Sequence, residues 1–337
     1  MRLFSIISLV LVSSILGGAE EPVTVRVGYF PNLTHSPAIA ARQLEREGAD
    51  WHLAHLPPGS KIEWRSYNAG PSAMEALLAG AIDLTYVGPS PVINAHVRTK
   101  GKEIRILAPV AHAGNALVVR KGLNLKTQKD FIGRRVATPQ LGNTQDIDAR
   151  VWLKQGGLKI TLNGGDAQIV PAANTELVML FSRGDVDAAW TVEPWVTRLI
   201  NEFGGEILVE NKESIITVLA SSKSALAKNR RGIEAFVQSH YLLRDKLLVD
   251  KSWHEKLVRD GMGGETRSTS PQAELISTAL GRVILDARED DDARKARLTG
   301  AFAQSLKDSQ SSGLLNGNAP IEPLLESLVA DPAPRQK

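Results

Sequence analysis

The chain has 337 residues, of which 23% are charged, a formal net charge of +3 and no cysteine. This length suits two globular lobes better than one, and the lack of cysteine excludes disulfides, thiolate metal sites and a cysteine nucleophile. Because the net charge is small and the basic residues are spread along the chain, we expect no nucleic-acid partner.

The first residues have the order of a secretory signal peptide. Met1-Arg2 precedes an apolar segment at 3–16, and the small residues Gly17-Gly-Ala19 follow it. The apolar segment is shorter than the roughly 20 residues that span a bilayer. We therefore expect cleavage after Ala19 and a periplasmic mature chain without a transmembrane helix. No cysteine follows the cleavage site, so no lipid anchor is expected; the alternative for this segment is a buried first strand.

The first lobe is expected to begin with a strand, a polar loop and a helix within residues 25–41. Ser36 is a plausible N-cap of this helix, with Pro37 at its first position. A strand at 61–67 then runs into Asn68-Ala-Gly-Pro-Ser72, which opens another helix. Both units therefore place a polar helix start after a strand end.

A helix-to-strand unit occurs twice, at a constant offset of 104 residues. Residues 74–86 align with residues 178–190, and Asp83 pairs with Asp187 in this alignment. Each copy has a helix, a glycine C-cap and a strand, and a proline-started helix follows. The repeat predicts two similar α/β lobes that face each other across a cleft, with helix N-termini pointing into it.

The chain is expected to cross between the lobes twice. An interrupted strand over 104–120 is the first crossing, and a strand over 215–220 is the second. Residues 20–113 and 217–330 then form lobe 1, residues 114–216 form lobe 2, and residues 331–337 form a disordered tail. Expected strands of lobe 2 are 135–138, 167–171, 187–191 and 206–209, and expected C-terminal helices are 231–248, 252–259, 271–287 and 291–307.

The loop after the strand at 135–138 has the features of an anion site. Gly142 permits a tight turn, Asn143 is a good N-cap, and Asp146 three residues later resembles a capping box. The helix that follows would face inward through its apolar residues. Its free backbone N–H groups and the positive end of its dipole suit an anionic or strongly polar small molecule.

Five blocks of this sequence, in the same order, are similar to those of the substrate-binding proteins of ATP-binding-cassette (ABC) importers. The chain resembles the nitrate/sulfonate/taurine group, and within it the aliphatic-sulfonate-binding members. The resemblance implies a type II periplasmic-binding-protein fold, with two lobes, a mixed sheet flanked by helices in each, and two crossing strands as hinge. It also implies a non-enzymatic, monomeric protein that needs no cofactor and has a small-molecule anion or zwitterion and an ABC importer permease as partners. The blocks are Val27-Gly-Tyr-Phe-Pro, Asn68-Ala-Gly-Pro-Ser, Ala79-Gly-Ala-Ile-Asp-Leu-Thr-Tyr-Val-Gly-Pro-Ser-Pro, Ala137-Thr-Pro-Gln-Leu-Gly-Asn-Thr-Gln-Asp and Asp187-Ala-Ala-Trp-Thr-Val-Glu-Pro-Trp.

Candidate ligand-binding residues lie at predicted helix starts, strand ends and the first crossing. Each polar candidate also has a structural alternative as an ordinary cap or loop residue, and Trp195 could bind ligand or belong to the core. The spacing of His52 and His55 could suit a metal, but no third ligand is near, so no metal is expected. The candidates are Asn32, Thr34, His35, Ser72, Ser90, Gly114, Asn115, Gly142, Asn143, Thr144, Gln145, Trp190 and Glu193.

The expected function is capture of an aliphatic sulfonate between the lobes and its delivery to an ABC importer. Taurine, nitrate, a phosphonate or a thiamine pyrimidine precursor are alternative ligands, and Glu193 with Asp146 would favour one that carries an amine. A small-acid lyase on the same scaffold is an alternative from another class. The sequence offers no nucleophile elbow, metal motif or Walker-type loop for it.

Overall fold

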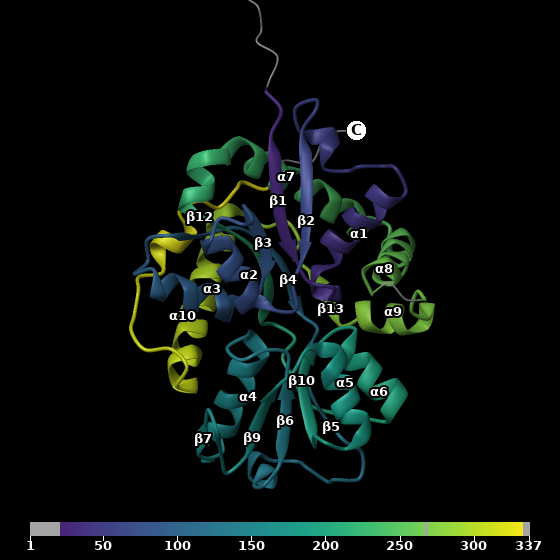
Figure 1. Ribbon diagram of the computed structural model, residues 1–337, viewed down its shortest axis with the longest axis vertical. Helices are drawn as coiled ribbons and strands as arrows, with labels where there is room; N and C mark the ends of the chain where they lie inside the picture. The colour runs from purple at the N-terminus through teal and green to yellow at the C-terminus, as the bar shows by residue number, and fades with distance from the viewer. Residues whose placement is uncertain (1–20, 267–268, 333–337) are drawn as a thin grey trace, which may run out of the picture.

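The structure is a computed structural model that describes residues 21–266 and 269–332. The predicted signal peptide lies outside the described residues. Figure 1 shows two lobes along the long axis, with the first and last described segments of the chain in the upper lobe and the middle of the chain in the lower one. Each lobe contains a sheet flanked by helices, so the predicted α/β class with mixed sheets is confirmed.

The first sheet belongs to the upper lobe and has six strands among the described residues. β1 pairs in parallel with β2 and β3, whereas β12 is antiparallel to both β3 and β4. In spatial order the strands are β13 (Val283–Leu285), β4 (Ile104–Ala113), β12 (Ile215–Ser222), β3 (Leu84–Val87), β1 (Thr24–Tyr29) and β2 (Lys61–Ser66).

The second sheet repeats this strand order in the lower lobe. In the first sheet β1 lies between β2 and β3, in the second sheet β6 lies between β9 and β10, and the antiparallel strand β12 or β5 comes next to β3 or β10. That antiparallel strand arrives from the other lobe: β5 follows β4, and β12 follows β11. The spatial order is β11 (Glu206–Glu210), β5 (Asn115–Val119), β10 (Ala188–Val192), β6 (Arg135–Thr138) and β9 (Gln168–Pro171), with β7 (Ile160–Thr161) and β8 (Gly164–Gly165) as a separate small hairpin.

The helices cover the sheets, and several of them start at the junction of the lobes. α1 packs against α8, and α3 packs against α10, which also contacts α4 of the lower lobe. The helices are α1 (Ser36–Arg46), α2 (Gly70–Leu78), α3 (Pro89–Arg98), α4 (Thr144–Gln155), α5 (Asn174–Arg183), α6 (Trp195–Phe203), α7 (Lys223–Val249), α8 (Lys251–Thr266), α9 (Ala273–Leu280) and α10 (Asp291–Ser312), with short 3-10 helices η1 (Leu33–His35), η2 (Leu53–His55), η3 (Gln128–Phe131) and η4 (Glu322–Leu325).

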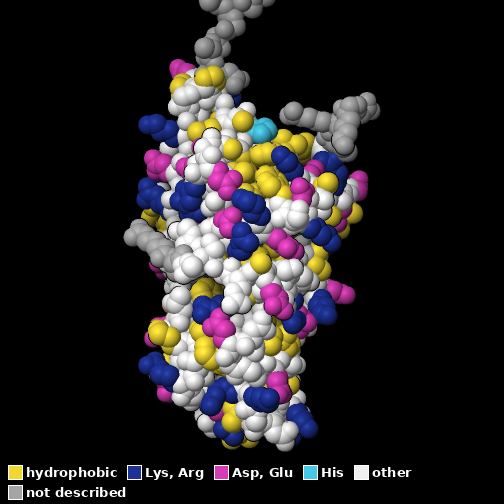
Figure 2. Space-filling model, turned by 90° about the vertical axis from the view of Figure 1, so that its right-hand side faces the viewer, with side chains coloured by type: hydrophobic (Ala, Val, Ile, Leu, Met, Phe, Trp, Pro, Cys, Tyr) yellow, Lys and Arg dark blue, Asp and Glu magenta, His cyan; other side chains and the backbone are white. Residues whose placement is uncertain are grey.

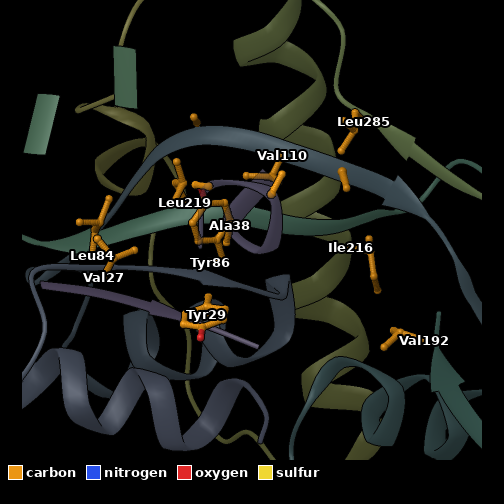
Figure 3. Close-up of a cluster of buried hydrophobic side chains, with 14 of the residues drawn as sticks. Val27, Tyr29, Ala38, Leu84, Tyr86, Val110, Val192, Ile216, Leu219 and Leu285 are labelled. Atoms are coloured by element: carbon orange, nitrogen blue, oxygen red, sulfur yellow. The ribbon is translucent and has the colours of Figure 1, made fainter. Parts of the chain in front are cut away.

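One hydrophobic cluster continues from the first lobe into the second. It runs from Tyr29 and Tyr86 of the first sheet to Ile216 of β12 and Val192 of β10 (Figure 3). The strands of both sheets are largely buried, as expected for sheets covered on both faces. On the face shown in Figure 2, basic and acidic side chains are interspersed over both lobes.

The internal repeat predicted from the sequence is confirmed by matching hydrogen bonds. Asp83 Oδ2 accepts from the backbone N–H of Arg26 at 2.8 Å, and Asp187 Oδ2 accepts from that of Arg135 at 2.8 Å. Arg26 of β1 and Arg135 of β6 lie at equivalent places in the two sheets. The aspartate of each copy therefore ties its own strand to the neighbouring parallel strand.

Three local predictions were wrong. Residues 283–285 form strand β13 within the segment expected to be one helix. The N-cap of α1 is His35, with Ser36 as the first helical residue. In the segment expected to be a tail, Asp331 accepts a hydrogen bond from Arg244 Nη1 at 2.7 Å, and residues 333–337 lie outside the described residues.

Candidate functional site

A small cavity lies between the lobes where helix starts meet. Its volume is about 30 Å³. η1 and the starts of α2 and α3 contribute from the first lobe, and the start of α4 contributes from the second. Helix starts present N–H groups without intrahelical partners and the positive end of the dipole, which favours an anionic occupant. The lining residues are Phe30, Asn32, Thr34, His35, Asn68, Ala69, Gly70, Gly88, Pro91, Pro139, Asn143, Thr144, Gln145, Val192 and Ile216.

His35 brings a neutral hydrogen-bond donor to this cavity. Its side chain is buried, and its Nδ1 accepts from the backbone N–H of Phe30 at 3.2 Å. This bond places the ring proton on Nε2. Burial lowers the pKa of His35 to about 3, so the imidazole is neutral near pH 7. A neutral donor can bind an anion without the desolvation cost of a buried cation.

Asn32 and Thr34 lie beside His35 on the same loop and also line the cavity. Asn32 Oδ1 accepts from Trp195 Nε1 at 2.9 Å. Trp195 belongs to the core cluster and is 4% exposed. Of its two alternatives, the structure thus places it in the core, where it holds Asn32 from the second lobe.

The start of α4 has a well-formed cap and one unpartnered hydroxyl. Asn143 Oδ1 accepts from the backbone N–H of Asp146 at 2.8 Å, and Asn143 Nδ2 donates to Gln145 Oε1 at 2.9 Å. Thr144 is only 8% exposed, yet its Oγ1 has no hydrogen-bond partner among the described residues. A buried hydroxyl without a partner costs about 1–3 kcal/mol, so this oxygen is suited to an occupant of the cavity.

Asp146 is turned away from the cavity. Its carboxylate accepts from Arg150 Nε at 3.0 Å, from Thr138 Oγ1 at 3.1 Å and from the backbone N–H of Gly142 at 2.9 Å. Asp146 and Arg150 form a buried ion pair. Asp146 is therefore not free to hold a ligand amine, because its oxygens already have partners on its own side of the loop.

Three predicted residues support the junction without lining the cavity. Ser72 Oγ donates to Gln140 Oε1 at 3.1 Å, which joins the two lobes. Gly142 has a φ of 76°, as its predicted tight turn requires, and Gly114 has a φ of 69° where β4 passes into β5. The two glycines thus permit turns that an L-residue would resist.

Ser90, Asn115 and Trp190 lie on the other side of Thr144. Ser90, Thr144 and Trp190 line a second cavity of about 550 Å³, between α3, α4, β10 and α10. Asn115 Oδ1 accepts from Trp190 Nε1 at 2.9 Å. The structure therefore separates the predicted site residues into two groups with Thr144 at their border.

Glu193 is fully buried and does not line the small cavity. Its carboxylate accepts from the backbone N–H of Thr197 at 3.0 Å and from Thr197 Oγ1 at 2.9 Å, and Arg282 Nε lies 3.4 Å away. Burial raises the pKa of Glu193 to about 7, although the Thr197 bonds and Arg282 oppose that shift. Glu193 thus lies just before α6, and its carboxylate bonds to Thr197 in the first turn of that helix.

Sequence reasoning missed several lining residues, including Asn68 and Gly88. Asn68 Nδ2 donates to Pro139 O at 3.0 Å, across the lobes. Asn68 follows a strand and precedes a helix, so the rule that selected Asn143 could have found it. No local signal marks Gly88, whose importance comes from close contact: a Cβ there would lie 2.5 Å from Thr144 Oγ1.

Neither a metal centre nor a membrane-spanning helix is found in residues 21–266 and 269–332. His52 Nδ1 lies 2.6 Å from Ser239 Oγ, and its ring stacks on Phe236. His55 Nδ1 lies 3.0 Å from Trp51 O. Both histidines are thus held by packing and by bonds to non-acidic partners.

Several known proteins similar to this chain are named for the binding of taurine or sulfonates. The taurine-binding periplasmic protein of Escherichia coli (strain K12) is 27% identical over 257 residues, which are 74% of this chain and 76% of that protein. A putative aliphatic sulfonates-binding protein of the same organism is 28% identical over 207 residues, 61% of this chain and 60% of that protein. The alkanesulfonate-binding protein from Xanthomonas axonopodis pv. citri bound to MOPS has the same fold, with a TM-score of 0.70 and 19% identity over 91% of this chain and 99% of that one.

These comparisons confirm the predicted resemblance and the predicted periplasmic-binding-protein fold. The model of the NMT1-like family matches residues 18–262, which include the first sheet up to β12, the whole second sheet and every residue that lines the small cavity. The chain belongs to the NMT1-like family.

Proposed function

We propose that this protein captures a small sulfonate-type oxyanion between its lobes outside the cytoplasm and delivers it to an ABC importer. The observation that carries this proposal is the small cavity, where helix starts from both lobes meet the unpartnered Thr144 hydroxyl and the neutral His35. Oriented N–H dipoles can stabilise an anion there without a buried Lys or Arg. The similar proteins that are named for taurine and alkanesulfonates support the same ligand class.

An oxyanion fits the lining better than an amine does. Among the described lining residues, none is an Asp, Glu, Lys or Arg. A ligand ammonium would therefore lose its hydration without gaining a carboxylate partner. This favours plain sulfonates and nitrate over taurine at this cavity.

Nitrate is the second candidate because of the cavity's size. By a measure in which one water needs about 10–15 Å³, a cavity of about 30 Å³ holds only a very small group. Nitrate could enter with little change, whereas an alkanesulfonate requires the lobes to move apart around its organic part.

Thermal unfolding of the mature protein with methanesulfonate, butanesulfonate, taurine, nitrate, sulfate and methylphosphonate tests the proposal. A ligand that binds only the folded state stabilises it by about 2.7 kcal/mol at a concentration of 100 times Kd, and so raises Tm. We expect Tm to rise with a sulfonate or nitrate and to rise less with taurine. An unchanged Tm across this panel would contradict the proposal.

Thr144→Val is the matched variant, because it removes the hydroxyl and keeps the shape of the side chain. Loss of one hydrogen bond to a charged ligand should weaken binding by about 1.5–3 kcal/mol, roughly 10- to 150-fold. Thr278→Val, on the exposed face of α9, is the control and should leave affinity unchanged. Equal affinities of the two variants for the ligand would show that the Thr144 hydroxyl does not contribute to binding.

We further propose that the protein releases its ligand chemically unchanged. Transport requires this, whereas a lyase would convert the ligand into a product. The described lining of the cavity offers no carboxylate, and its one histidine, whose pKa burial lowers to about 3, is a weak base for moving a proton. Proton NMR of the bound ligand after overnight incubation with the protein should recover only the starting compound. A new product that depends on the protein would favour the lyase.

A further inference from the structure

The second cavity, of about 550 Å³, has a different chemistry from the first. Walls from both lobes enclose it: α4 and β10 on one side, and α3, α10 and the crossing segment before β12 on the other. Its volume lies within the range of about 300–1,000 Å³ that is usual for pockets that bind organic molecules. It is therefore large enough for a ligand with a hydrocarbon or aromatic body.

Two tryptophans form the aromatic wall of this cavity. The rings of Trp152 and Trp190 meet edge to face, with centroids 6.3 Å apart. Asn115 holds the second ring in place, because its Oδ1 accepts from Trp190 Nε1 at 2.9 Å. The same amide donates through Nδ2 to Asp148 Oδ2 at 2.9 Å. The Asn115 side chain thus fixes the Trp190 indole ring and the Asp148 carboxylate relative to each other.

The charges around the cavity are mostly negative. Asp148 of α4, Asp308 of α10 and Glu213 of the crossing segment all line it, and the one lining cation in the described chain is Arg297. Arg297 already pairs with Asp286 at 2.8 Å and with Glu289, so its charge is balanced elsewhere. Asp148 and Asp308 repel each other across the lobe boundary. A positively charged occupant would relieve that repulsion.

Unpartnered hydroxyl groups also line this cavity. Thr144, at 8% exposure, forms part of its wall, and neither Thr144 Oγ1 nor Ser214 Oγ has a hydrogen-bond partner among the described residues. The described carboxylates do not come together closely enough to hold a metal ion. The cavity therefore offers acceptors and aromatic faces spread over a large volume, which suits an organic ion better than a bare metal ion.

We propose that this cavity is a second ligand site, which binds an organic ammonium compound with its cationic head between Asp148 and Asp308 and its hydrocarbon body against Trp152 and Trp190. Tryptophan is the best aromatic partner for a cation, and a carboxylate beside it adds a charge-assisted hydrogen bond. Because its walls come from both lobes, the occupant also holds the lobes together. It would thereby strengthen anion binding in the small cavity.

Isothermal titration calorimetry with 2-phenylethylammonium and with neutral 2-phenylethanol tests the site at pH 8. The two probes have nearly the same shape and differ in charge. We expect the ammonium compound to bind at least tenfold more tightly than the alcohol. Equal affinities, or no heat with either probe, would overturn the proposal.

Asp148→Asn removes the charge and keeps the size of the side chain, and Asp308→Asn does the same on the other lobe. Either variant should weaken binding of 2-phenylethylammonium at least tenfold. Because Asp308 lies in α10, the result with Asp308→Asn does not depend on whether Asp148→Asn disturbs α4. Glu176→Gln, an equal change of charge on the exposed start of α5, should leave it unchanged. Unaltered binding to both aspartate variants would overturn the proposal.

The pH dependence gives another measurement. Burial raises the pKa of Asp148 to about 7, and the repulsion from Asp308 adds to this rise. Asp308, Glu213 and Arg297 are the other charged groups that line the cavity. Since a cation binds the ionised carboxylate, affinity should be about tenfold lower at pH 6 than at pH 8. Affinity that is constant over this range would contradict a role for Asp148.

Saturation with an anion that occupies the small cavity separates the two sites. If they are distinct, 2-phenylethylammonium should bind at least as tightly in the presence of saturating nitrate or methanesulfonate. Competition between ammonium and anion would mean a single site and overturn the proposal. The result with the ammonium probe does not depend on the sulfonate proposal, so either can fail alone.

Discussion

At the scale of single residues, α4 contains two buried polar side chains, Arg150 and Thr144, that differ in their hydrogen bonding. Arg150 donates to Asp146 and to Thr161 O, and both members of the ion pair are nearly inaccessible to water. Thr144 Oγ1, six residues earlier, has no partner in the described chain. Because buried polar groups in native proteins are nearly always bonded, the unbonded one is the better candidate for contact with a ligand.

Arg150→Met should destabilise the protein strongly. The substitution leaves the Asp146 carboxylate buried without its cation, which typically costs about 3–5 kcal/mol. Arg230→Met is the matched control, since Arg230 forms an ion pair of the same i,i+4 spacing with Glu234 at an exposed site. That variant should lose less than about 1 kcal/mol in urea unfolding. Similar losses of stability in both variants would show that the buried ion pair contributes no more to stability than the exposed one.

At the scale of elements, the short segment around β13 shows how context decides structure. Residues 283–285 lie in a stretch whose helical pattern was expected to continue, but they pair antiparallel with residues 111–113 of β4. A short apolar run is compatible with either a helix or a strand. Residues 283–285 form a strand because the edge of β4 offers them hydrogen-bond partners. That edge exists only once the first sheet has formed.

Gly88 controls how closely α3 and α4 approach each other. Its φ of −77° is ordinary for any residue, so an alanine there would not strain the backbone. The added Cβ would lie 2.5 Å from Thr144 Oγ1, across the lobe boundary. Gly88→Ala should therefore preserve each lobe and oppose their contact, which would weaken anion binding at least tenfold and raise the radius of gyration in X-ray scattering.

Two further variants test whether the close approach to Thr144 causes the effect of Gly88→Ala. Adding Thr144→Ser, which keeps the hydroxyl and removes the methyl group that restricts its rotation, should restore part of the affinity. Gly300→Ala, in α10 with no atom within 4 Å of its added Cβ, should leave binding unchanged. Unaltered binding to Gly88→Ala would mean that the lobes do not need this close contact.

At the scale of the whole molecule, contacts at several places hold the lobes together. Lys154 of α4 donates to Ser311 O at 3.0 Å and to Ser312 O at 2.8 Å, at the C-terminal end of α10. Arg282 pairs with Glu210 at 3.1 Å near the second crossing. These bonds join the lobes around the cavities, so the structure is that of a closed arrangement.

Buried titratable groups set how stability changes with pH. Burial lowers the pKa of five histidines, so their stabilising contribution is present above about pH 6.5 and is lost as pH falls towards their folded values. Asp148 and Glu193, with pKa values raised to about 7, act in reverse: their contribution is present below about pH 4 and is lost as pH rises to 7. The histidines are His35, His52, His96, His240 and His254.

The five histidines outweigh Asp148 and Glu193 between about pH 4.5 and 6.5, so the free energy of unfolding should fall as pH is lowered from 7 to 5. Each group contributes about 1.4 kcal/mol per pH unit at most. Glu193→Gln removes one opposing group and should make the loss steeper, whereas exposed Glu176→Gln should not. Urea unfolding at several pH values measures this, and a stability that rises on acidification would contradict it.

Much of the candidate site could be predicted from sequence because its signals are local. Asn143 caps α4 as predicted, and Gly142 adopts the positive φ that its turn needs. His35, Asn32 and Thr34 were found by the same reasoning about a polar loop between a strand and a helix. Whether Asp146 points into the site or away from it could not be read from the sequence, because its partner Arg150 lies four residues on, where the direction of a side chain depends on what the helix packs against.

The cap of α4, the turns, the repeated unit and the sheet-and-helix class could be read from the sequence, because these depend on residues within a few positions of one another or on a repeat in one chain. Tertiary packing was needed to show that Thr144 is unpartnered, that Gly88 lies close to it, and that Asp148 and Asp308 line one cavity between the lobes. Each of these facts joins elements that come together only when the chain crosses twice between its sheets. Burial and charge at such places are properties of the packed molecule, which no local pattern contains.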